Sequence, residues 1–408
     1  MSAAHASAAG NGAAPGAPGA VPRVLLLSSR VVDHSLWHGP QYEFEDVIAE
    51  VDAVRLLTPG LKPTSDLRKL GQDAIHLAWK SVLALTQRSP NDKPPLMLPG
   101  TLDEDYDLLF AVFHFPQDLA HLDAVRGWRK RCRKAVCFIV ELWTPEVRDY
   151  RSYLELLRDF DHVFVFNSVV MDSVSRIAGR PVGYMATGID AARFAPYPSP
   201  PERVIDCYWY GRRSPIGHRQ LAAMAERREL FYVHDTIRQN PMVDYRQHRV
   251  LLASLLQRSR YAMAYRINED RLVRTEGDEG LTARLFEITA AGAVMLGSRP
   301  HCGEFDRFFD WPDALIDVPW EPKDMRAVLA ELDAQPERLA LARRRNVANA
   351  LRRHDWVYRW QQVLEAAGMA PLPAFTRRVE RLHEMARAVE GAAGLPSSPA
   401  GALAGRAG

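Results

Sequence analysis

The feature that most constrains the fold of this chain is a regular alternation of short apolar runs with longer segments of helical period. The runs are rich in Val, Leu, Ile and aromatic residues, as in 106–113 and 135–140, which is typical of buried strands. The segments between them are long enough to form helices that connect parallel strands. The alternation therefore predicts an α/β protein built from βαβ units.

This alternation occurs twice, and each occurrence predicts its own parallel sheet. Strand candidates in the first half are 23–27, 53–57, 106–113, 135–140, 162–166 and 182–185. Candidates in the second half are 205–210, 230–233, 261–265, 293–296 and 314–318. Two Rossmann-like domains are therefore expected to face each other across a cleft. Such a cleft is the usual ligand site, because strand carboxyl ends and helix amino ends converge there.

A proline-rich segment, Pro196–Pro201, marks the expected domain boundary, because proline extends neither a helix nor a central strand. Both ends of the chain are rich in Ala, Gly and Pro, which predicts disorder. The start also lacks the basic segment and Leu-rich core of a secretory signal. The expected organisation is a leader at 1–21, a first domain at 22–195, a second domain at 196–370, a C-terminal helix at 371–390 and a tail at 391–408.

Composition and charge exclude several classes of protein. The 52 Lys and Arg residues against 50 Asp and Glu leave a net charge of +2. No whole-molecule field therefore favours nucleic acid as a partner, and an anion site must be a local cluster of cations. No apolar stretch approaches the roughly 18 residues that a membrane span needs. The four cysteines form no Cys-x-x-Cys pair and predict neither a zinc site nor a disulfide framework. A cytoplasmic protein is expected.

The densest functional signal is a segment that reads Glu-Gly-Leu-Thr-Ala-Arg-Leu-Phe-Glu, from Glu279 to Glu287. A Gly-containing loop leads into a helix, so the backbone amides of Gly280, Leu281 and Thr282 are expected at the start of that helix. Unpaired amides and the helix dipole make such an end a site for phosphate. A carboxylate accepts two hydrogen bonds at once, so the two glutamates suit the vicinal hydroxyls of a ribose or a hexose.

Three segments together resemble a known family. Glu279 and Glu287 are separated by seven residues, and Glu287 belongs to a Phe-Glu-x-x-Ala-x-Gly segment. This pattern resembles the motif of retaining glycosyltransferases with the GT-B fold, of group 1 or family 4. Thr187-Gly-Ile-Asp190, continuing to Phe194 and Pro196, resembles the interdomain segment of that family. His354-Asp-Trp356 with Arg359 resembles its terminal segment. The resemblance spans roughly residues 187–367 and implies two Rossmann-like domains.

The resemblance implies an enzyme that transfers a hexose-like sugar from a nucleoside diphosphate sugar with retention of anomeric configuration. It assigns Glu279 to the donor sugar, as a catalytic residue, and Glu287 to the ribose. Basic residues after the first strand of the second domain would bind the diphosphate, here Arg212 and Arg213. The Lys-Gly of the family is absent, and Arg219 is a candidate replacement. No metal is expected, since cations and the helix dipole offset the diphosphate charge.

His114, in Ala-Val-Phe-His-Phe-Pro, is a second catalytic candidate. It follows a strand of the first domain, where members of the family often carry a histidine close to the sugar. Its aromatic neighbours fit a core histidine equally well, and both readings stay open. The family places the acceptor mainly in the first domain, but no motif in this sequence identifies it.

Further alternatives stay open at this point. The basic segment from Arg126 to Lys134 fits either a peripheral contact with an anionic membrane or the exposed face of a helix. Arg284 fits an ion pair with Glu287 or a ligand contact. The same fold and site would also serve a nucleotide-sugar epimerase, or a non-catalytic protein that binds nucleotide sugars as a scaffold.

Overall fold

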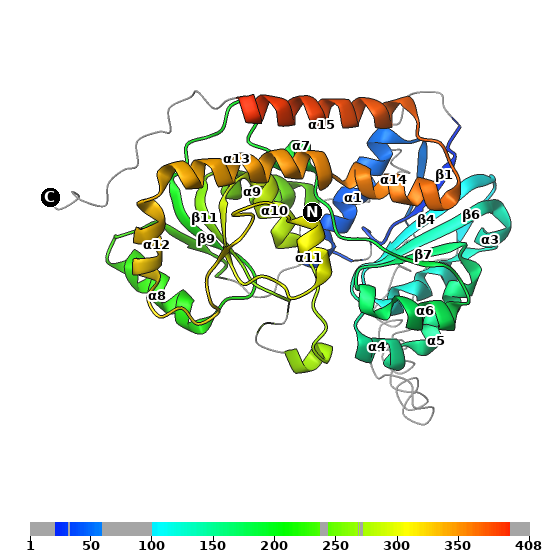
Figure 1. Cartoon of the computed structure of the whole chain (residues 1–408). Helices are drawn as coiled ribbons and strands as arrows, with labels where there is room; N and C mark the ends of the chain where they lie inside the picture. Colours follow the sequence, from blue (N-terminus) through cyan, green and yellow to red (C-terminus); the bar gives the residue numbers. More distant parts are fainter. Residues whose placement is uncertain are drawn as a thin grey trace, which may run out of the picture.

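The structure of this protein is a computed structural model. It shows two α/β units, with long C-terminal helices lying across both of them (Figure 1). The predicted leader and tail lie outside the described residues, apart from Val21 and Gly391. The residues that the structure describes are 21–58 without Val32, 100–236, and 244–391 without 268, 270 and 271.

The first unit contains a six-stranded sheet in which all neighbouring strands are parallel. Its order is β2-β1-β4-β6-β7-β8. The strands are β1 (Val24–Leu27), β2 (Val54–Leu57), β4 (Tyr106–Phe113), β6 (Cys132–Ile139), β7 (His162–Val165) and β8 (Val182–Tyr184). Each strand coincides closely with one expected from the sequence, because an apolar run that is buried on both faces leaves a strong local signal. A small separate pair consists of β3 (Gly100–Thr101) and β5 (Val125–Arg126).

The second unit contains a five-stranded parallel sheet of order β10-β9-β11-β12-β13. Its strands are β9 (Ile205–Trp209), β10 (Tyr232–His234), β11 (Ser259–Ala264), β12 (Val294–Gly297) and β13 (Ile316–Asp317). The α/β class with two Rossmann-like sheets is thereby confirmed. The proline-rich segment Pro196–Pro201 lies between the last strand of the first sheet and β9.

Helices separate the strands, as parallel connections require. Before β9 they are η1 (Leu36–His38), α1 (Gly39–Val51), η2 (Pro116–Ala124), α3 (Trp128–Arg131), α4 (Thr144–Asp149), α5 (Arg151–Leu154), η3 (Glu155–Asp159), η4 (Ser168–Val170), α6 (Met171–Ala178) and α7 (Ala191–Phe194). After β9 they are α8 (Pro215–Glu226), α9 (Tyr245–Gln257), η5 (Leu272–Thr275), α10 (Ala283–Ala291), α11 (Gly303–Phe308), α12 (Met325–Asp333), α13 (Pro336–Arg353), α14 (Trp356–Ala367) and α15 (Pro373–Gly391).

The apolar core continues from one unit into the other. Side chains alternate between the two faces of a strand, so in β1 Leu25 belongs to a core that lies within the first unit, whereas Leu26 faces a larger one. That larger core also contains Tyr208 of β9 and Met295 of β12, together with residues of α1, α9, α10 and α14. The two sheets are therefore joined by a shared layer of helices.

The position of α14 corrects the expected domain boundary. The sequence assigns residues up to 370 to the second domain, but α14 packs against α1 and β6 of the first unit. Trp360 of α14 is fully buried; its ring lies 5.6 Å from that of Phe110, and its Nε1 donates to Asp52 at 3.1 Å. Helical periodicity shows that a face is apolar, but it does not show which surface covers that face. The chain therefore returns to the first unit after α13.

Two of the family-like segments form the junction between the units. The amide of Ile189 donates to the carbonyl of His354, and the amide of Trp356 donates to the carbonyl of Ile189, each at 3.0 Å. A Cβ atom at Gly188 would lie 2.7 Å from the ring of Trp356, so the close approach requires glycine. Segments 187–190 and 354–356 are thus paired in space. They lie at the two places where the chain passes from one unit to the other.

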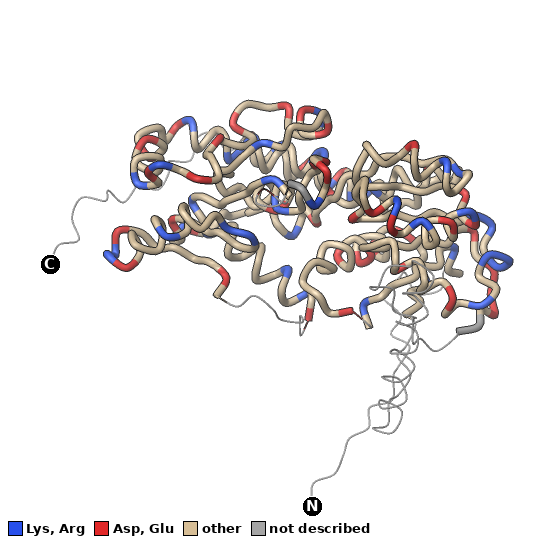
Figure 2. Tube along the Cα trace, turned by 90° about the horizontal axis from the view of Figure 1, so that it is seen from below, with Lys and Arg blue, Asp and Glu red and all other residues tan. Residues whose placement is uncertain are grey.

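The basic segment from Arg126 to Lys134 runs from β5 through α3 into β6. Three of its cations have acidic partners: Arg129 pairs with Asp161 (3.1 Å), Arg131 with Asp105 (2.9 Å) and Arg133 with Asp107 (3.4 Å). Residues of both charge signs are interspersed along the tube of both units (Figure 2). These partners reduce the local positive charge that a membrane contact would use. In the described part of the chain, no helix combines the length and apolarity that a membrane crossing requires.

Candidate active site

The loop before α10, in the second unit, contacts the first unit. Glu276 and Gly277 have φ values of 52° and 89°, so the backbone turns sharply there. Asp278 then accepts hydrogen bonds from the amide of Thr144 (2.8 Å) and from Nδ2 of Asn167 (2.9 Å). Both donors follow the carboxyl ends of strands in the first sheet. The glutamate motif therefore lies where the two sheets approach each other.

Gly280 and Leu281 bring the start of α10 to this contact. A Cβ atom at position 280 would lie 2.4 Å from Cζ of Phe166 in the first unit, which explains the need for glycine. Leu281 is fully buried in the shared core. Contact between their amides and a phosphate stays a prediction.

Thr282 stands directly before α10, where the first amides of a helix lack intrahelical partners. Its side chain makes no capping hydrogen bond, and among the described residues its buried hydroxyl has no partner. A buried hydroxyl without a partner costs free energy, and such groups occur where a ligand supplies the missing bond. The geometry therefore offers a hydroxyl and a helix N-terminus to one acceptor-rich ligand.

Glu279 is held at both of its carboxylate oxygens. Oε1 lies 2.8 Å from Nη1 of Arg266, and Oε2 accepts from the amide of His301 at 2.5 Å. The side chain keeps an exposed fraction of 12%. Arg266 is itself paired with Glu269 at 2.6 Å. The carboxylate is thus fixed in orientation and still reachable from solvent.

Glu287 is more deeply buried than its position in the motif indicates. Only 4% of the residue is exposed. Oε2 accepts from the hydroxyl of Tyr210 at 2.8 Å, and Oε1 is bound by Nη1 of Arg249. Both motif glutamates therefore point into the protein, at opposite ends of the segment that starts α10. The sugar and ribose roles assigned to them stay predictions.

The three candidate arginines after β9 differ in their surroundings, and two of them, Arg212 and Arg213, lie in the loop itself. Arg213 is half-buried and donates to the carbonyl of Asp235 at 2.7 Å. Arg212, its neighbour in the loop, accepts at its carbonyl from Nε1 of Trp209 at 3.1 Å. Arg219 lies on the exposed face of α8, where its Nε reaches the carbonyl of Pro215 at 3.3 Å. Arg212 and Arg213 remain the better candidates for a phosphate contact, because they belong to the loop at the end of β9.

Arg284 belongs to the same region. Its Nη1 donates to the carbonyl of Tyr210 at 3.4 Å and would lie 3.1 Å from a Cβ atom at Gly211. These two described residues, Arg284 and Glu287, form no ion pair. Burial lowers the pKa of the Arg284 guanidinium. Arg284 is a partly buried cation of α10 that lies beside the end of β9 and forms no ion pair with Glu287. This arrangement favours a ligand contact over a helix ion pair.

His114 lies at the carboxyl end of β4 and is buried, with 6% exposed. Its Nε2 is 3.6 Å from Oε2 of Glu141, and its ring centroid lies 4.8 Å from that of His38. Burial lowers the pKa of His114, so the ring is neutral near pH 7. Its Nδ1 has no partner in the described part of the chain. The residue is packed like a core histidine, yet it retains one unused nitrogen.

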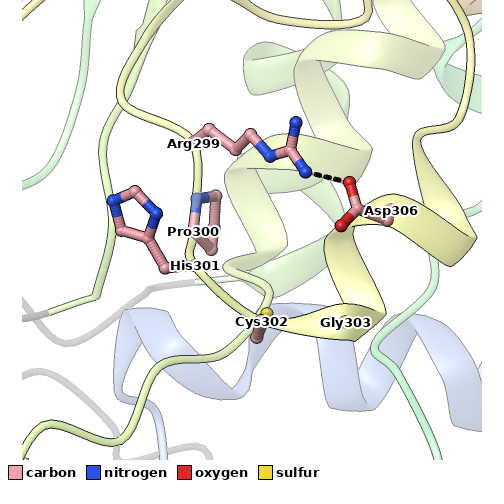
Figure 3. A pocket seen from close by; sticks show the side chains of 6 residues that line it. All are labelled: Arg299, Pro300, His301, Cys302, Gly303 and Asp306. Atoms are coloured by element: carbon pink, nitrogen blue, oxygen red, sulfur yellow. Dashed lines mark hydrogen bonds and ion pairs between the residues drawn. The ribbon is translucent and has the colours of Figure 1, made fainter.

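A pocket of about 480 Å³ opens after β12, at the start of α11. It is lined by Arg299, Pro300, His301, Cys302, Gly303 and Asp306. Figure 3 shows the Arg299 guanidinium paired with Asp306, and the His301 imidazole on the other side of Pro300. The amide of His301 binds Glu279, so the pocket adjoins the first glutamate of the motif. No sequence motif pointed to it.

Arg249, Tyr210 and Arg266 contact the motif glutamates, and the sequence analysis missed all three. Arg249 did leave a signal, because it is a charged residue on the stripe of α9 that also buries Leu252, Ala253 and Leu256. A buried charge on an apolar stripe requires a partner. Tyr210 follows β9 directly, in the position where strand ends usually present ligand-binding residues. Arg266 likewise follows the end of β11.

Four cysteines are free in the structure, and three of them are buried. Within the ranges 21–58, 100–236 and 244–391, allowing for their gaps, no three His, Cys, Asp or Glu side chains cluster closely enough to hold a metal ion. Cys302, which is partly exposed, lines the pocket after β12.

Two parallel sheets joined through a shared helical layer, with a glutamate-flanked helix N-terminus between them, define the GT-B class of architecture. An α-glucosyltransferase, solved in complex with UDP and a 13-mer DNA containing an HMU base, matches with a TM-score of 0.50 and 11% identity, over 85% of this chain and 99% of that chain. A trehalose-phosphate synthase (UDP-forming) from Burkholderia vietnamiensis matches with a TM-score of 0.48 and 13% identity, over 88% and 99% of the two chains. HepE of Anabaena, in complex with UDP-glucose, matches with a TM-score of 0.46 and 12% identity, over 85% of this chain and 99% of that chain.

Residues 213–365 match the family model described as glycosyl transferase-like. This part of the chain, which includes most of the second unit and α14, is therefore similar to glycosyl transferase-like domains. The GT-B part of the resemblance is confirmed, whereas the group 1 or family 4 assignment and the retaining stereochemistry stay predictions. The search of curated proteins found no match.

Proposed function

We propose that this chain is a retaining glycosyltransferase that moves a hexose-like sugar from a nucleoside diphosphate sugar to an acceptor. The observation that carries the proposal is the buried, unpartnered hydroxyl of Thr282 at the N-terminus of α10. It lies between the two motif glutamates in sequence, inside the matched region 213–365. A diphosphate supplies the acceptor oxygens that this hydroxyl and the free amides lack.

The surrounding residues support the rest of the donor. Glu279 is fixed beside the pocket after β12, which leaves space for a hexose. From the described residues, Glu287 accepts one hydrogen bond at each oxygen, and it can accept more from a ribose. Arg212 and Arg213 would counter the negative charge that develops on the diphosphate as the sugar leaves. Interactions that strengthen as charge develops lower the barrier rather than only the binding energy.

UDP is the first nucleotide to test. The α-glucosyltransferase with which the chain shares its fold was solved in complex with UDP. The acceptor is proposed to bind to the first unit, near His114. Transfer breaks the bond between the anomeric carbon and the phosphate oxygen and joins that carbon to an acceptor oxygen. The acceptor proton must leave, and the neutral His114 has a nitrogen without a partner among the described residues, which can take the proton or orient the hydroxyl.

The proposal is tested by screening UDP-, GDP- and ADP-sugars for release of free nucleoside diphosphate and for thermal stabilisation of the chain. A bound donor should raise the melting temperature by mass action. An epimerase would interconvert sugars without forming a new glycosidic bond, and a scaffold would be stabilised without turnover. Stabilisation by none of these donors would overturn the proposal.

Replacing Thr282 by valine is expected to have opposite effects on stability and on binding. The hydroxyl has no partner in the free chain, so its removal should leave the free energy of unfolding unchanged or raise it by about 1 kcal/mol. Affinity for the nucleoside diphosphate should fall roughly tenfold, because one hydrogen bond to a charged group is lost. Calorimetric titration and urea unfolding measure the two quantities.

Thr289→Val in the same helix is the matched control. The Thr289 hydroxyl donates to the carbonyl of Leu285 at 2.5 Å, inside the helix and away from its N-terminus. This variant should lose some stability and keep its nucleotide affinity. Equal affinity losses in the two variants would show that Thr282 does not contact the diphosphate.

A further inference from the structure

Arg249 joins the second motif glutamate to the first unit of the protein. It lies on α9, is 1% exposed, and is the largest charged side chain among the fully buried residues. Its Nε donates to Oε2 of Glu43 at 2.8 Å and its Nη2 to Oε1 of Glu43 at 3.3 Å. Its Nη1 binds Oε1 of Glu287. One guanidinium therefore links α1 of the first unit to α10 of the second.

Glu43 is in turn fixed to the junction between the units. Its Oε1 accepts from the amide of Asp190 at 2.8 Å and from Nε1 of Trp356 at 3.1 Å. Asp190 and Trp356 belong to the two paired segments through which the chain crosses between the units. The position of Arg249 is consequently set by the way the two units meet.

Arg249 supplies a positive charge that is shared by two buried carboxylates. Burial alone would lower the pKa of Arg249, but the carboxylates of Glu43 and Glu287 raise it well above its usual value, so the guanidinium is always charged. Without it, two carboxylates with exposed fractions of 1% and 4% would lack a cation. An unpaired buried carboxylate takes up a proton or turns toward water.

The orientation of the Glu287 carboxylate decides whether it can bind ribose. An ionised carboxylate offers about four acceptor positions, of which Arg249 and the Tyr210 hydroxyl use one each. The remaining positions can accept hydrogen bonds from hydroxyl groups. A Glu287 carboxylate turned away from this position would lose this capacity, even if the fold around it survived.

We propose that Arg249 is a positioning residue for ribose recognition, which holds the Glu287 carboxylate in its orientation and makes that orientation depend on the docking of the two units through Glu43. The inference rests on the proposed function, since it assumes that Glu287 meets a nucleotide. It extends that function by naming the residue that sets the discrimination between ribose and 2′-deoxyribose.

The test compares binding of a nucleoside diphosphate with binding of its 2′-deoxy form. UDP, GDP and ADP are first compared by calorimetric titration of the wild-type chain, and the tightest binder is used together with its 2′-deoxy counterpart. The wild type should prefer the ribonucleotide roughly tenfold or more, because a hydrogen bond to a charged group is lost in the deoxy form. The ratio of the two dissociation constants is the readout, since general destabilisation weakens both ligands alike.

Arg249→Met should bring this ratio close to one, while Arg249→Lys should recover part of it by restoring the charge. Arg246→Met is the matched control. Arg246 also lies on α9 and also pairs with α1, through Asp46 at 3.0 Å, but it does not touch Glu287. The control should keep the wild-type ratio of dissociation constants, because it removes the ion pair with Asp46 and leaves the contacts of Glu287 intact.

Tyr210→Phe covers the case in which Arg249→Met fails to fold. It removes one of the two donors to Glu287 and leaves the ion pair, so the ratio should fall by a smaller factor. Wild-type ratios in both Arg249→Lys and Tyr210→Phe, or in a folded Arg249→Met, would overturn the inference and leave the proposed function standing. So would a wild type that binds both nucleotides equally. A wild type that binds no nucleotide would overturn the proposed function itself.

Discussion

Replacing Glu279 by glutamine is expected to reduce sugar transfer by at least about a hundredfold, the loss seen when one preorganised charged contact to a transition state is removed. Affinity for the free nucleoside diphosphate should be unchanged, because Glu279 is assigned to the sugar. Its carboxylate is held between Nη1 of Arg266 and the amide of His301, both of which are donors. Glutamine would place its own amide donor against one of them, so both charge and orientation are lost.

Glu276→Gln is the matched control for this experiment. Glu276 lies in the same loop, but its side chain is 45% exposed and pairs with Arg148 at the surface. Initial rates and calorimetric titrations of the two variants separate turnover from binding, since loss of a contact made only in the transition state lowers kcat and leaves binding intact. Near-normal turnover in Glu279→Gln would remove this residue from the catalytic machinery.

Replacing Arg378 by methionine is expected to destabilise the protein by about 3–5 kcal/mol, the usual effect of removing one partner from a buried ion pair. Arg378 on α15 is 7% exposed. Its guanidinium binds Asp355 at 2.9 Å, Asp190 at 2.8 Å and Glu50 at 2.7 Å. Asp355 is fully buried and Asp190 nearly so. The variant therefore removes the cation of Asp355 and leaves Asp190 with Arg193 alone, at 3.2 Å, at the junction between the units.

Chemical denaturation followed by tryptophan fluorescence measures this loss. Trp356 and Trp360 are buried on α14, near the affected junction. The control is Arg377→Met, the same substitution at the exposed neighbouring position on α15, with an expected change within about 0.5 kcal/mol. If Arg378→Met changed stability no more than Arg377→Met does, the junction would not depend on this cluster of charges.

The interdomain segments show how far a resemblance in sequence can reach. The Thr187–Asp190 and His354–Trp356 segments resemble two separate parts of the family motif, the interdomain segment and the terminal segment. The structure shows that they pair with each other through the Ile189 hydrogen bonds, and that Arg359 donates to the carbonyl of Thr187 at 3.0 Å. Their residue types are explained by the docking of the two units. Sequence similarity located them without revealing this contact, because pairing between distant segments leaves no local periodicity.

The candidate site also combines features that the sequence predicts with contacts that it does not reveal. The turn at Gly280, the start of α10 and the two motif glutamates could be predicted, because spacing and helix-start chemistry are local properties. The partners of those glutamates could not. Arg249 contacts Glu287 from a different helix, and Arg266 contacts Glu279 from the end of a different strand. Which distant side chain compensates a buried charge depends on the packing of whole elements.

The two series of strands and the helices between them are predictable from the amino-acid sequence, since apolar periods of two and 3.6 residues record the burial of each element's faces. The start of the glycosyl transferase-like motif is predictable in the same way. Long-range packing, in contrast, places α14 on the first sheet rather than the second and links Glu287 to Glu43 through Arg249. The reason is that hydrophobic burial is non-directional: a pattern shows that a surface is covered, but the choice of partner follows from shape and charge in three dimensions.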